Sequence, residues 1–109
     1  MVITPEQKGL AIHRFERSEE TLKESTDALS LKNFRLTVNR SYYAVFYAMR
    51  AFLAIVNQDS SKHMGVMYLF NQHFIKTGIV SEISFKTIQS LMDLRHEEDY
   101  QDYCKDSRR

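Results

Sequence analysis

Arg95 is the residue whose type and position most strongly suggest chemistry. It continues the inward-facing apolar stripe of the last helical segment, where a leucine would be expected. Burying a guanidinium is costly unless it is paired, and Asp99 lies four residues on, on the same helix face. With Tyr100 nearby, two interpretations stay open. The pair closes the end of a bundle as a salt bridge, or it forms a polar pocket for a phosphate or a base, which suits the planar fork of arginine.

A second set of candidate ligand-binding residues lies in the middle of the chain. Tyr43 and Tyr47 are four residues apart, and Arg40 and Arg50 flank them on neighbouring helix faces. Tyrosine rings and guanidiniums together can stack bases and bind phosphates. The same pattern is also typical of an ordinary core whose tyrosine hydroxyls reach its rim. Arg40, Tyr43 and Tyr47 are therefore predicted to line a ligand site or a subunit contact, or else to belong to the core.

Histidine is the remaining side chain with useful proton chemistry near neutral pH. His63 is expected near the start of the third helix, where it either takes part in chemistry or simply caps and packs. His96 adjoins Arg95. The four histidines show no metal-ligand spacing, and neither a phosphate-binding glycine loop nor a nucleophile motif occurs. The sequence therefore predicts no metal site and no cofactor.

The elements that must position these residues are helices of a single domain, residues 1–109. Three glycines and one proline favour long helices joined by few turns. Lys and Arg number 15 and Asp and Glu 14, which excludes a strongly basic nucleic-acid clamp but not a local basic patch. The lone cysteine, Cys104, implies no oxidising compartment. Because no apolar run approaches the roughly 20 residues of a membrane span, we expect a cytoplasmic protein without membrane contact.

Hydrophobic periodicity divides the chain into four helical segments, with breaks near residues 30–32, 57–61 and 76–81. The second segment, about 33–56, is apolar on most sides and is predicted to be the central helix. The fourth begins at Ser81. The prediction is an all-α fold, an antiparallel up-and-down helical bundle of four main helices with room for a short fifth.

The same pattern predicts details of the segments. Thr4 and Gln7 have the spacing of a capping box at the start of the first helix. Leu22 and Leu29 belong to the stripe that this helix is expected to turn inward, and Met64 to the inner stripe of the third helix.

Together, these pieces resemble the HEPN domain family over roughly residues 5–103. The resemblance is carried by the order and spacing of residues 40–48 (Arg-Ser-Tyr-Tyr-Ala-Val-Phe-Tyr-Ala), His63 with Gly65 and Val66, residues 74–79, and Arg95 with Asp99 and Tyr100. It implies a helical bundle that is often a homodimer. It also implies a partner, because small HEPN proteins are frequently encoded beside a minimal nucleotidyltransferase in toxin–antitoxin or defence modules.

The resemblance further implies that the protein acts on RNA or a nucleotide, but the ribonuclease signature of the family is incomplete here. That signature is an arginine followed after four to six residues by a histidine. Arg95 matches it, whereas positions 100–102 hold Tyr, Gln and Asp. His96 points about 100° away around the helix, and His63 could transfer a proton only if the fold or a dimer brings it near Arg95.

Three functions are therefore open. The first is a non-catalytic nucleotide- or RNA-associated component of a HEPN–nucleotidyltransferase module, with Arg95, Asp99, Tyr100, Arg40, Tyr43 and Tyr47 as its binding residues. The second is a metal-independent ribonuclease toxin that uses Arg95 with His96 or His63. The third is a structural or interaction bundle in which Arg95 and Asp99 form a buried brace.

Overall fold

The computed structural model describes residues 3–81 together with Lys86 and Asp93. Its elements are three α-helices, α1 (Pro5–Ser30), α2 (Phe34–Ile55) and α3 (His63–Phe70), and a π-helical turn, η1 (Asn71–Ile75), that continues α3. Residues 3–81 contain no strand, so the predicted all-α class is confirmed. The predicted fourth helix lies outside the described residues, apart from Lys86 and Asp93. The count of four helices, and any fifth, therefore stay predictions.

The ends of α1 and α2 are fixed by side-chain caps. The capping box is confirmed: Thr4 Oγ1 accepts a hydrogen bond from the backbone N–H of Gln7 (3.1 Å), and Gln7 Oε1 accepts one from the backbone N–H of Thr4 (2.8 Å). After α1 the chain turns through Lys32, which has a positive φ of 59°. Asn33 then caps α2 by accepting from the N–H of Leu36 (3.3 Å).

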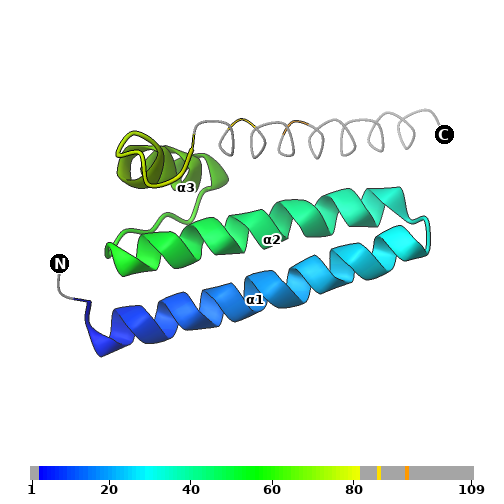
Figure 1. Cartoon of the computed structure of the whole chain (residues 1–109), viewed down its shortest axis with the longest axis horizontal. Coiled ribbons are helices and arrows are strands. Elements are labelled where there is room, and N and C mark those ends of the chain that lie inside the picture. The colour runs from blue at the N-terminus through cyan, green and yellow to red at the C-terminus, as the bar shows by residue number, and fades with distance from the viewer. Residues whose placement is uncertain (1–2, 82–85, 87–92, 94–109) are drawn as a thin grey trace.

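Helices α1 and α2 form a long antiparallel hairpin (Figure 1). The side chains between them are small: Ala11, Thr21, Ser25 and Ala28 from α1 and Ala44 and Ala51 from α2 are all buried. The serine hydroxyls along this contact donate hydrogen bonds to the backbone of α2. Ser18 Oγ donates to the carbonyl of Ala44 (2.6 Å), and Ser25 Oγ lies 3.1 Å from the carbonyl oxygen of Thr37. This small-residue seam holds the two backbones close together along the hairpin.

The apolar core lies on the other side of α2, where α3 covers its C-terminal half (Figure 1). Its members are Phe46, Met49 and Leu53 from α2, Val66, Met67 and Phe70 from α3, and Phe74 and Ile75 from η1. The rings of Phe52 and Phe74 lie 5.2 Å apart, and those of Phe70 and Phe74 lie 5.3 Å apart. Contacts on two sides confirm the prediction that α2 is the central helix.

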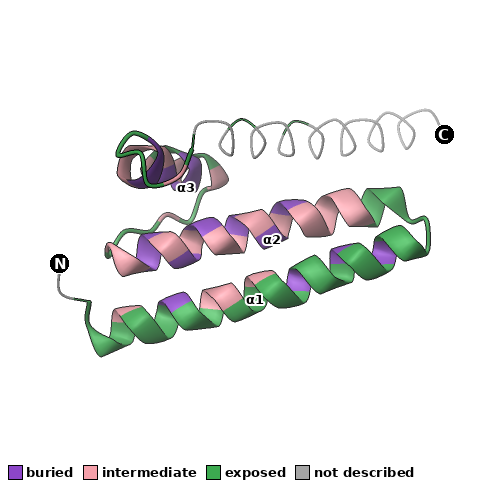
Figure 2. Cartoon of the chain, viewed as in Figure 1, coloured by how far each residue is buried: buried purple, intermediate pink, exposed green. Residues whose placement is uncertain are grey.

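Three residues predicted to face inward are exposed instead. The exposed fractions of Leu22, Leu29 and Met64 are 56%, 52% and 71%. Within residues 3–81, α1 contacts α2 through its small residues, so the buried stripe is narrower than its apolar stripe, and most of the helix surface is exposed (Figure 2). No helix in the described part of the chain is both long and apolar enough to cross a lipid bilayer.

Candidate functional site

Two guanidiniums lie over two tyrosine rings on one flank of the hairpin. The guanidinium carbon of Arg40 is 5.4 Å from the ring centroid of Tyr43, and that of Arg17 is 5.5 Å from the centroid of Tyr47. The two ring centroids are 6.1 Å apart. The two distances between guanidinium and ring are within the range of cation–π attraction. We call Arg17, Arg40, Tyr43 and Tyr47 the arginine–tyrosine strip.

The carboxylates near the arginine–tyrosine strip bind it loosely. An oxygen of Glu20 lies 3.8 Å from Arg17 Nη1, and an oxygen of Glu24 lies 3.8 Å from Arg40 Nη1. Arg40 also donates from Nε and Nη2 to the side-chain oxygen of Asn39 (3.0 and 2.7 Å). At 3.8 Å, with both glutamate side chains more than half exposed, these ion pairs contribute little to stability, so the strip keeps its positive charge available to an anion.

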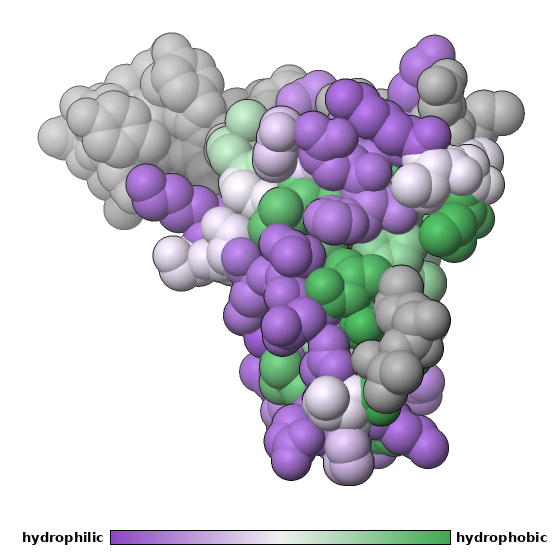
Figure 3. All heavy atoms as spheres, turned by 90° about the vertical axis from the view of Figure 1, so that its left-hand side faces the viewer, coloured by the Kyte–Doolittle hydropathy of each residue, from purple (hydrophilic) through white to green (hydrophobic). Residues whose placement is uncertain are grey.

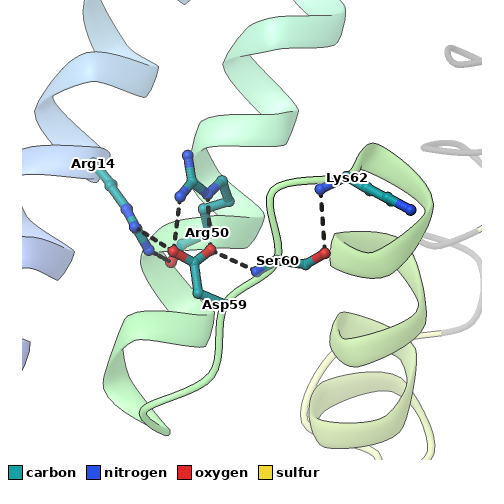
Figure 4. Close-up of polar contacts among 5 residues, drawn as sticks. All are labelled: Arg14, Arg50, Asp59, Ser60 and Lys62. Atoms are coloured by element: carbon teal, nitrogen blue, oxygen red, sulfur yellow. Dashed lines mark hydrogen bonds and ion pairs between the residues drawn. The ribbon is translucent and has the colours of Figure 1, made fainter.

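A second pair of arginines is bound tightly to one carboxylate, that of Asp59 in the loop between α2 and α3. Arg50 donates from Nε to Oδ1 (3.0 Å) and from Nη2 to Oδ2 (2.8 Å), and Arg14 Nη2 donates to Oδ2 (2.9 Å) (Figure 4). Arg14 Nη1 also donates to the carbonyl of Arg50 (3.0 Å). We call Arg14, Arg50 and Asp59 the Asp59 brace, because it ties α1, α2 and the loop together.

The Asp59 brace changes the acidity of its carboxyl group. The hydrogen bonds from Arg50, with smaller effects from the N–H of Ser60 and from Arg14, lower the pKa of Asp59 from 3.8 to about 2, against the opposing effect of partial burial. The carboxylate therefore stays charged at any physiological pH. Asp59 offsets one of the two positive charges, and both guanidiniums already donate hydrogen bonds within the brace, so they are poorer sites for a further anion than the arginines of the strip.

The loop that carries Asp59 leads directly to His63. The N–H of Ser60 donates to Asp59 Oδ1 (2.8 Å), and the N–H of Lys62 donates to Ser60 Oγ (3.2 Å) (Figure 4). Ser60 can lie against α3 only because residue 65 is glycine: a Cβ there would be 2.8 Å from Ser60 Cβ and would also meet Ser60 Oγ. The Asp59 brace and Gly65 thus fix the path of the chain into α3.

His63, the first residue of α3, is held by aromatic residues of α2. Tyr42 Oη lies 2.5 Å from His63 Nδ1, and the imidazole ring is 4.4 Å from the ring of Phe46 and 6.0 Å from that of Tyr43. Tyr42 is buried and His63 is half-buried. An imidazole oriented by a hydrogen bond at one nitrogen is the usual arrangement of a histidine that transfers protons.

The structure therefore brings some predicted residues together and leaves others outside. Arg40, Tyr43 and Tyr47 lie side by side, and His63 is in ring contact with Tyr43. Arg50 lies over Phe46 and binds Asp59. The remaining candidates, Arg95, His96, Asp99 and Tyr100, fall outside the described residues, so their roles stay predictions.

Sequence reasoning missed three residues of this region: Arg14, Arg17 and Asp59. A signal for two of them was present in the hairpin turn. In the pairs Arg14–Arg50, Arg17–Tyr47 and Glu24–Arg40 the two residue numbers add up to 64, which is the register of an antiparallel hairpin that turns at Lys32.

Polar and apolar surfaces alternate at the end of the hairpin where α1 begins and α2 ends (Figure 3). An open cavity of about 220 Å³ lies there, lined by Glu6, Gln7, Leu10, Arg14, Ala54, Asn57, Gln58 and Asp59. Among the described residues, no three His, Cys, Asp or Glu side chains gather as the ligands of a metal ion would. Of the groups described in this section, the arginine–tyrosine strip can bind an anion and His63 can transfer a proton.

The described residues form a helical hairpin with a third helix packed on the aromatic face of α2, which makes this an all-α protein. The family model of the HEPN domain matches residues 12–109. The chain therefore belongs to the HEPN domain family.

Three relatives show how far the similarity extends. The chain is 34% identical over 85 residues to a Methanocaldococcus jannaschii protein named "Putative toxin MJ0605", covering 78% of this chain and 63% of that protein. It is 41% identical over 86 residues to the "UPF0332 protein" of Thermotoga maritima, covering 77% and 64%. It is 38% identical over 76 residues to the "UPF0332 protein glr0978" of Gloeobacter violaceus, covering 70% and 57%.

The matched part of the chain spans about three-fifths of the length of these curated relatives. No solved structure matches the chain at a significant level.

Proposed function

We propose that this chain is the RNA- or nucleotide-binding HEPN component of a toxin–antitoxin or defence module, acting as a homodimer beside a nucleotidyltransferase. Membership of the HEPN family supports the proposal, as does a relative that is named a toxin. The observation that carries the RNA-binding part is the arginine–tyrosine strip, in which two guanidiniums each lie over a tyrosine ring on the same flank of the hairpin.

The strip binds phosphates through Arg17 and Arg40. Each tyrosine ring restricts the guanidinium above it, which reduces the entropy lost when a phosphate is bound. The two arginines of the Asp59 brace do not take part, because Asp59 already holds both. Binding is therefore expected to be electrostatic and sensitive to salt.

Single-stranded RNA binding tests this part of the proposal. Arg40→Ala and Arg17→Ala are each expected to weaken binding of a labelled oligonucleotide about three- to tenfold and to reduce its salt dependence by roughly one phosphate contact, as measured by fluorescence anisotropy. Lys23→Ala is the matched control, because it removes one positive charge from an exposed position of α1 outside the strip. Equal effects of all three variants would assign the binding to overall charge and would count against the strip.

The nucleotidyltransferase partner is tested by co-expression with the protein encoded beside this one. We expect a complex that survives affinity purification and size-exclusion chromatography, with two HEPN chains in it. If no nucleotidyltransferase is encoded nearby and none co-purifies, this part of the proposal is wrong, whether or not RNA is bound.

A metal-independent ribonuclease toxin is the second candidate, and one contact favours it: the hydrogen bond of 2.5 Å between Tyr42 Oη and His63 Nδ1, next to the strip. In this version His63, or His96 beside Arg95, moves the proton of the 2′-hydroxyl, and Arg95 binds the phosphate. Purified protein is incubated with total RNA in the presence of a chelator. Cleavage that is lost in His63→Ala and Arg95→Ala supports the enzyme, whereas cleavage by Arg95→Ala at the parental rate shows that the site is wrongly assigned.

A further inference from the structure

We infer that Glu20 and Glu24 hold the positions of two neighbouring phosphates on the arginine–tyrosine strip and must be displaced when single-stranded RNA binds. The two carboxylates then act as specificity determinants, because they select a ligand with several phosphates. This inference rests on the proposed RNA-binding function of the strip and adds residues that no motif of the sequence analysis included.

The geometry of the two carboxylates is repeated. In both cases one arginine contacts both a tyrosine ring and a glutamate: the guanidinium carbon of Arg17 is 5.5 Å from the Tyr47 centroid, and its Nη1 is 3.8 Å from a carboxylate oxygen of Glu20. Arg40 is 5.4 Å from the Tyr43 centroid and 3.8 Å from Glu24.

The spacing of the two carboxylates also repeats. Glu20 and Glu24 are four residues apart on α1, so their Cβ atoms are neighbours, about 5–6 Å from each other on one face of the helix. Two anionic groups at a fixed, short spacing along a line are also what an extended RNA backbone presents.

The carboxylates are displaceable because they are exposed and loosely bound. The exposed fractions of the side chains of Glu20 and Glu24 are 67% and 52%, and both ion pairs are 3.8 Å long. Asp59, in contrast, lies 2.8–3.0 Å from three guanidinium nitrogens. Ion pairs of the first kind exchange readily with solvent and with other anions, whereas the hydrogen-bonded charges of the Asp59 brace stay in place.

The glutamates affect different ligands to different extents. An isolated anion has to compete with a tethered carboxylate at a single arginine and gains little by replacing it. A strand with consecutive phosphates replaces both carboxylates in one binding event, because its second contact is intramolecular once the first has formed. The strip is therefore expected to bind oligonucleotides and to discriminate against single phosphates.

The test compares two double variants of the full chain. Glu20→Gln with Glu24→Gln is expected to bind a single-stranded RNA oligonucleotide about three- to tenfold more tightly than the parent. Glu16→Gln with Glu19→Gln removes the same charge from exposed positions of α1 that form no ion pair with Arg17 or Arg40, and it is expected to change binding less than about twofold. If the two double variants tighten RNA binding equally, the glutamates act only through net charge and the inference is overturned.

A second probe separates this inference from the proposed function. Inorganic triphosphate carries linked phosphates but no base, and its effect is read as the rise in melting temperature of each variant. A larger rise for the Glu20/Glu24 variant than for the Glu16/Glu19 variant supports the part of the inference in which the two carboxylates occupy phosphate positions, even if RNA does not bind. RNA binding without any advantage for the Glu20/Glu24 variant overturns the inference and leaves the proposed function standing. If RNA does not bind and the Glu20/Glu24 variant shows no larger rise in melting temperature, both the inference and the proposed RNA-binding function are overturned.

Discussion

The carboxylate of Asp59 accepts two hydrogen bonds, of 3.0 and 2.8 Å, from the guanidinium of Arg50. This bidentate pair ties the loop after α2 to the helix that it has just left. Arg14 adds α1 to the same carboxylate. A single acidic residue thus sets where the chain enters α3 and, four residues later, where His63 lies.

Asp59→Asn is expected to destabilise the fold by about 1–2 kcal/mol, because two arginines lose their shared counter-charge. The free energy of unfolding is measured by urea denaturation. Glu16→Gln, an exposed change on the outer face of α1, is the control and is expected to alter stability by less than about 0.5 kcal/mol. Equal stability of the two variants would show that the Asp59 brace contributes nothing.

The stabilisation by Asp59 also predicts a dependence on pH. Its pKa is lowered to about 2 in the folded chain, compared with 3.8 for the free group. Between these values the unfolded chain binds a proton that the folded chain does not, so stability from this group is complete above about pH 5 and is lost as the pH falls towards 2. Since 45% of the side chain is exposed, solvent screening reduces the effect to on the order of 1 kcal/mol.

The measurement compares the parent with Asp59→Asn at several pH values. The difference between their free energies of unfolding is expected to shrink steadily from pH 5 to pH 2.5. A difference that stays constant over this range would mean that the ionised carboxylate is not what stabilises the loop.

Gly65→Ala is expected to destabilise the protein by about 1–3 kcal/mol, because the added Cβ would clash with Ser60 Oγ and lie 2.8 Å from Ser60 Cβ, so it must push the loop away from α3. The matched control is Gly9→Ala in α1. It has no heavy atom within 4 Å of the new Cβ and should gain about 0.5–1 kcal/mol from its higher helix propensity. Melting temperatures of both variants show whether the signs are opposite.

Combining Gly65→Ala with Ser60→Gly sharpens that test. If the clash with Ser60 is the cause, the second change restores most of the stability lost in the first, and a double-mutant cycle shows a large coupling. Additive effects would show that Gly65 is needed for another reason.

Tyr42→Phe is expected to cost about 1 kcal/mol, because it removes the hydroxyl that lies 2.5 Å from His63 Nδ1 at a buried position. Tyr68→Phe is the control: that hydroxyl accepts a hydrogen bond from Gln72 Nε2 but is exposed to water, which replaces it. Urea denaturation gives the stabilities, and the ring resonances of His63 in NMR spectra should shift only in Tyr42→Phe.

Much of the hairpin could be predicted from the sequence because its signals are local. Thr4 with Gln7 and the asparagine at position 33 fix helix ends by contacts within four residues. The prediction that Leu22 and Leu29 are buried was wrong. Periodicity shows which residues share a helix face, but it does not show how much of that face a neighbouring helix covers.

The site was harder to predict because it joins residues far apart in sequence. Arg40, Tyr43 and Tyr47 were found because they share one helix, whereas Arg17 reaches Tyr47 from α1. Predicting the contact between Arg17 and Tyr47 requires the register of α1 against α2, which depends on the residue at which the chain turns. Arg95 and Asp99 lie outside the described residues and stay predictions.

The small-residue seam has a consequence for the longest side chains of the hairpin. Because alanine and serine separate the two backbones, a side chain as long as that of Arg17 can span the interhelical gap and still cover a ring on the opposite helix. The separation of α1 and α2 therefore determines where the guanidinium of Arg17 lies over Tyr47. An increase in bulk at Ala44, itself out of contact with any ligand, would widen the gap and move the cation off its aromatic partner.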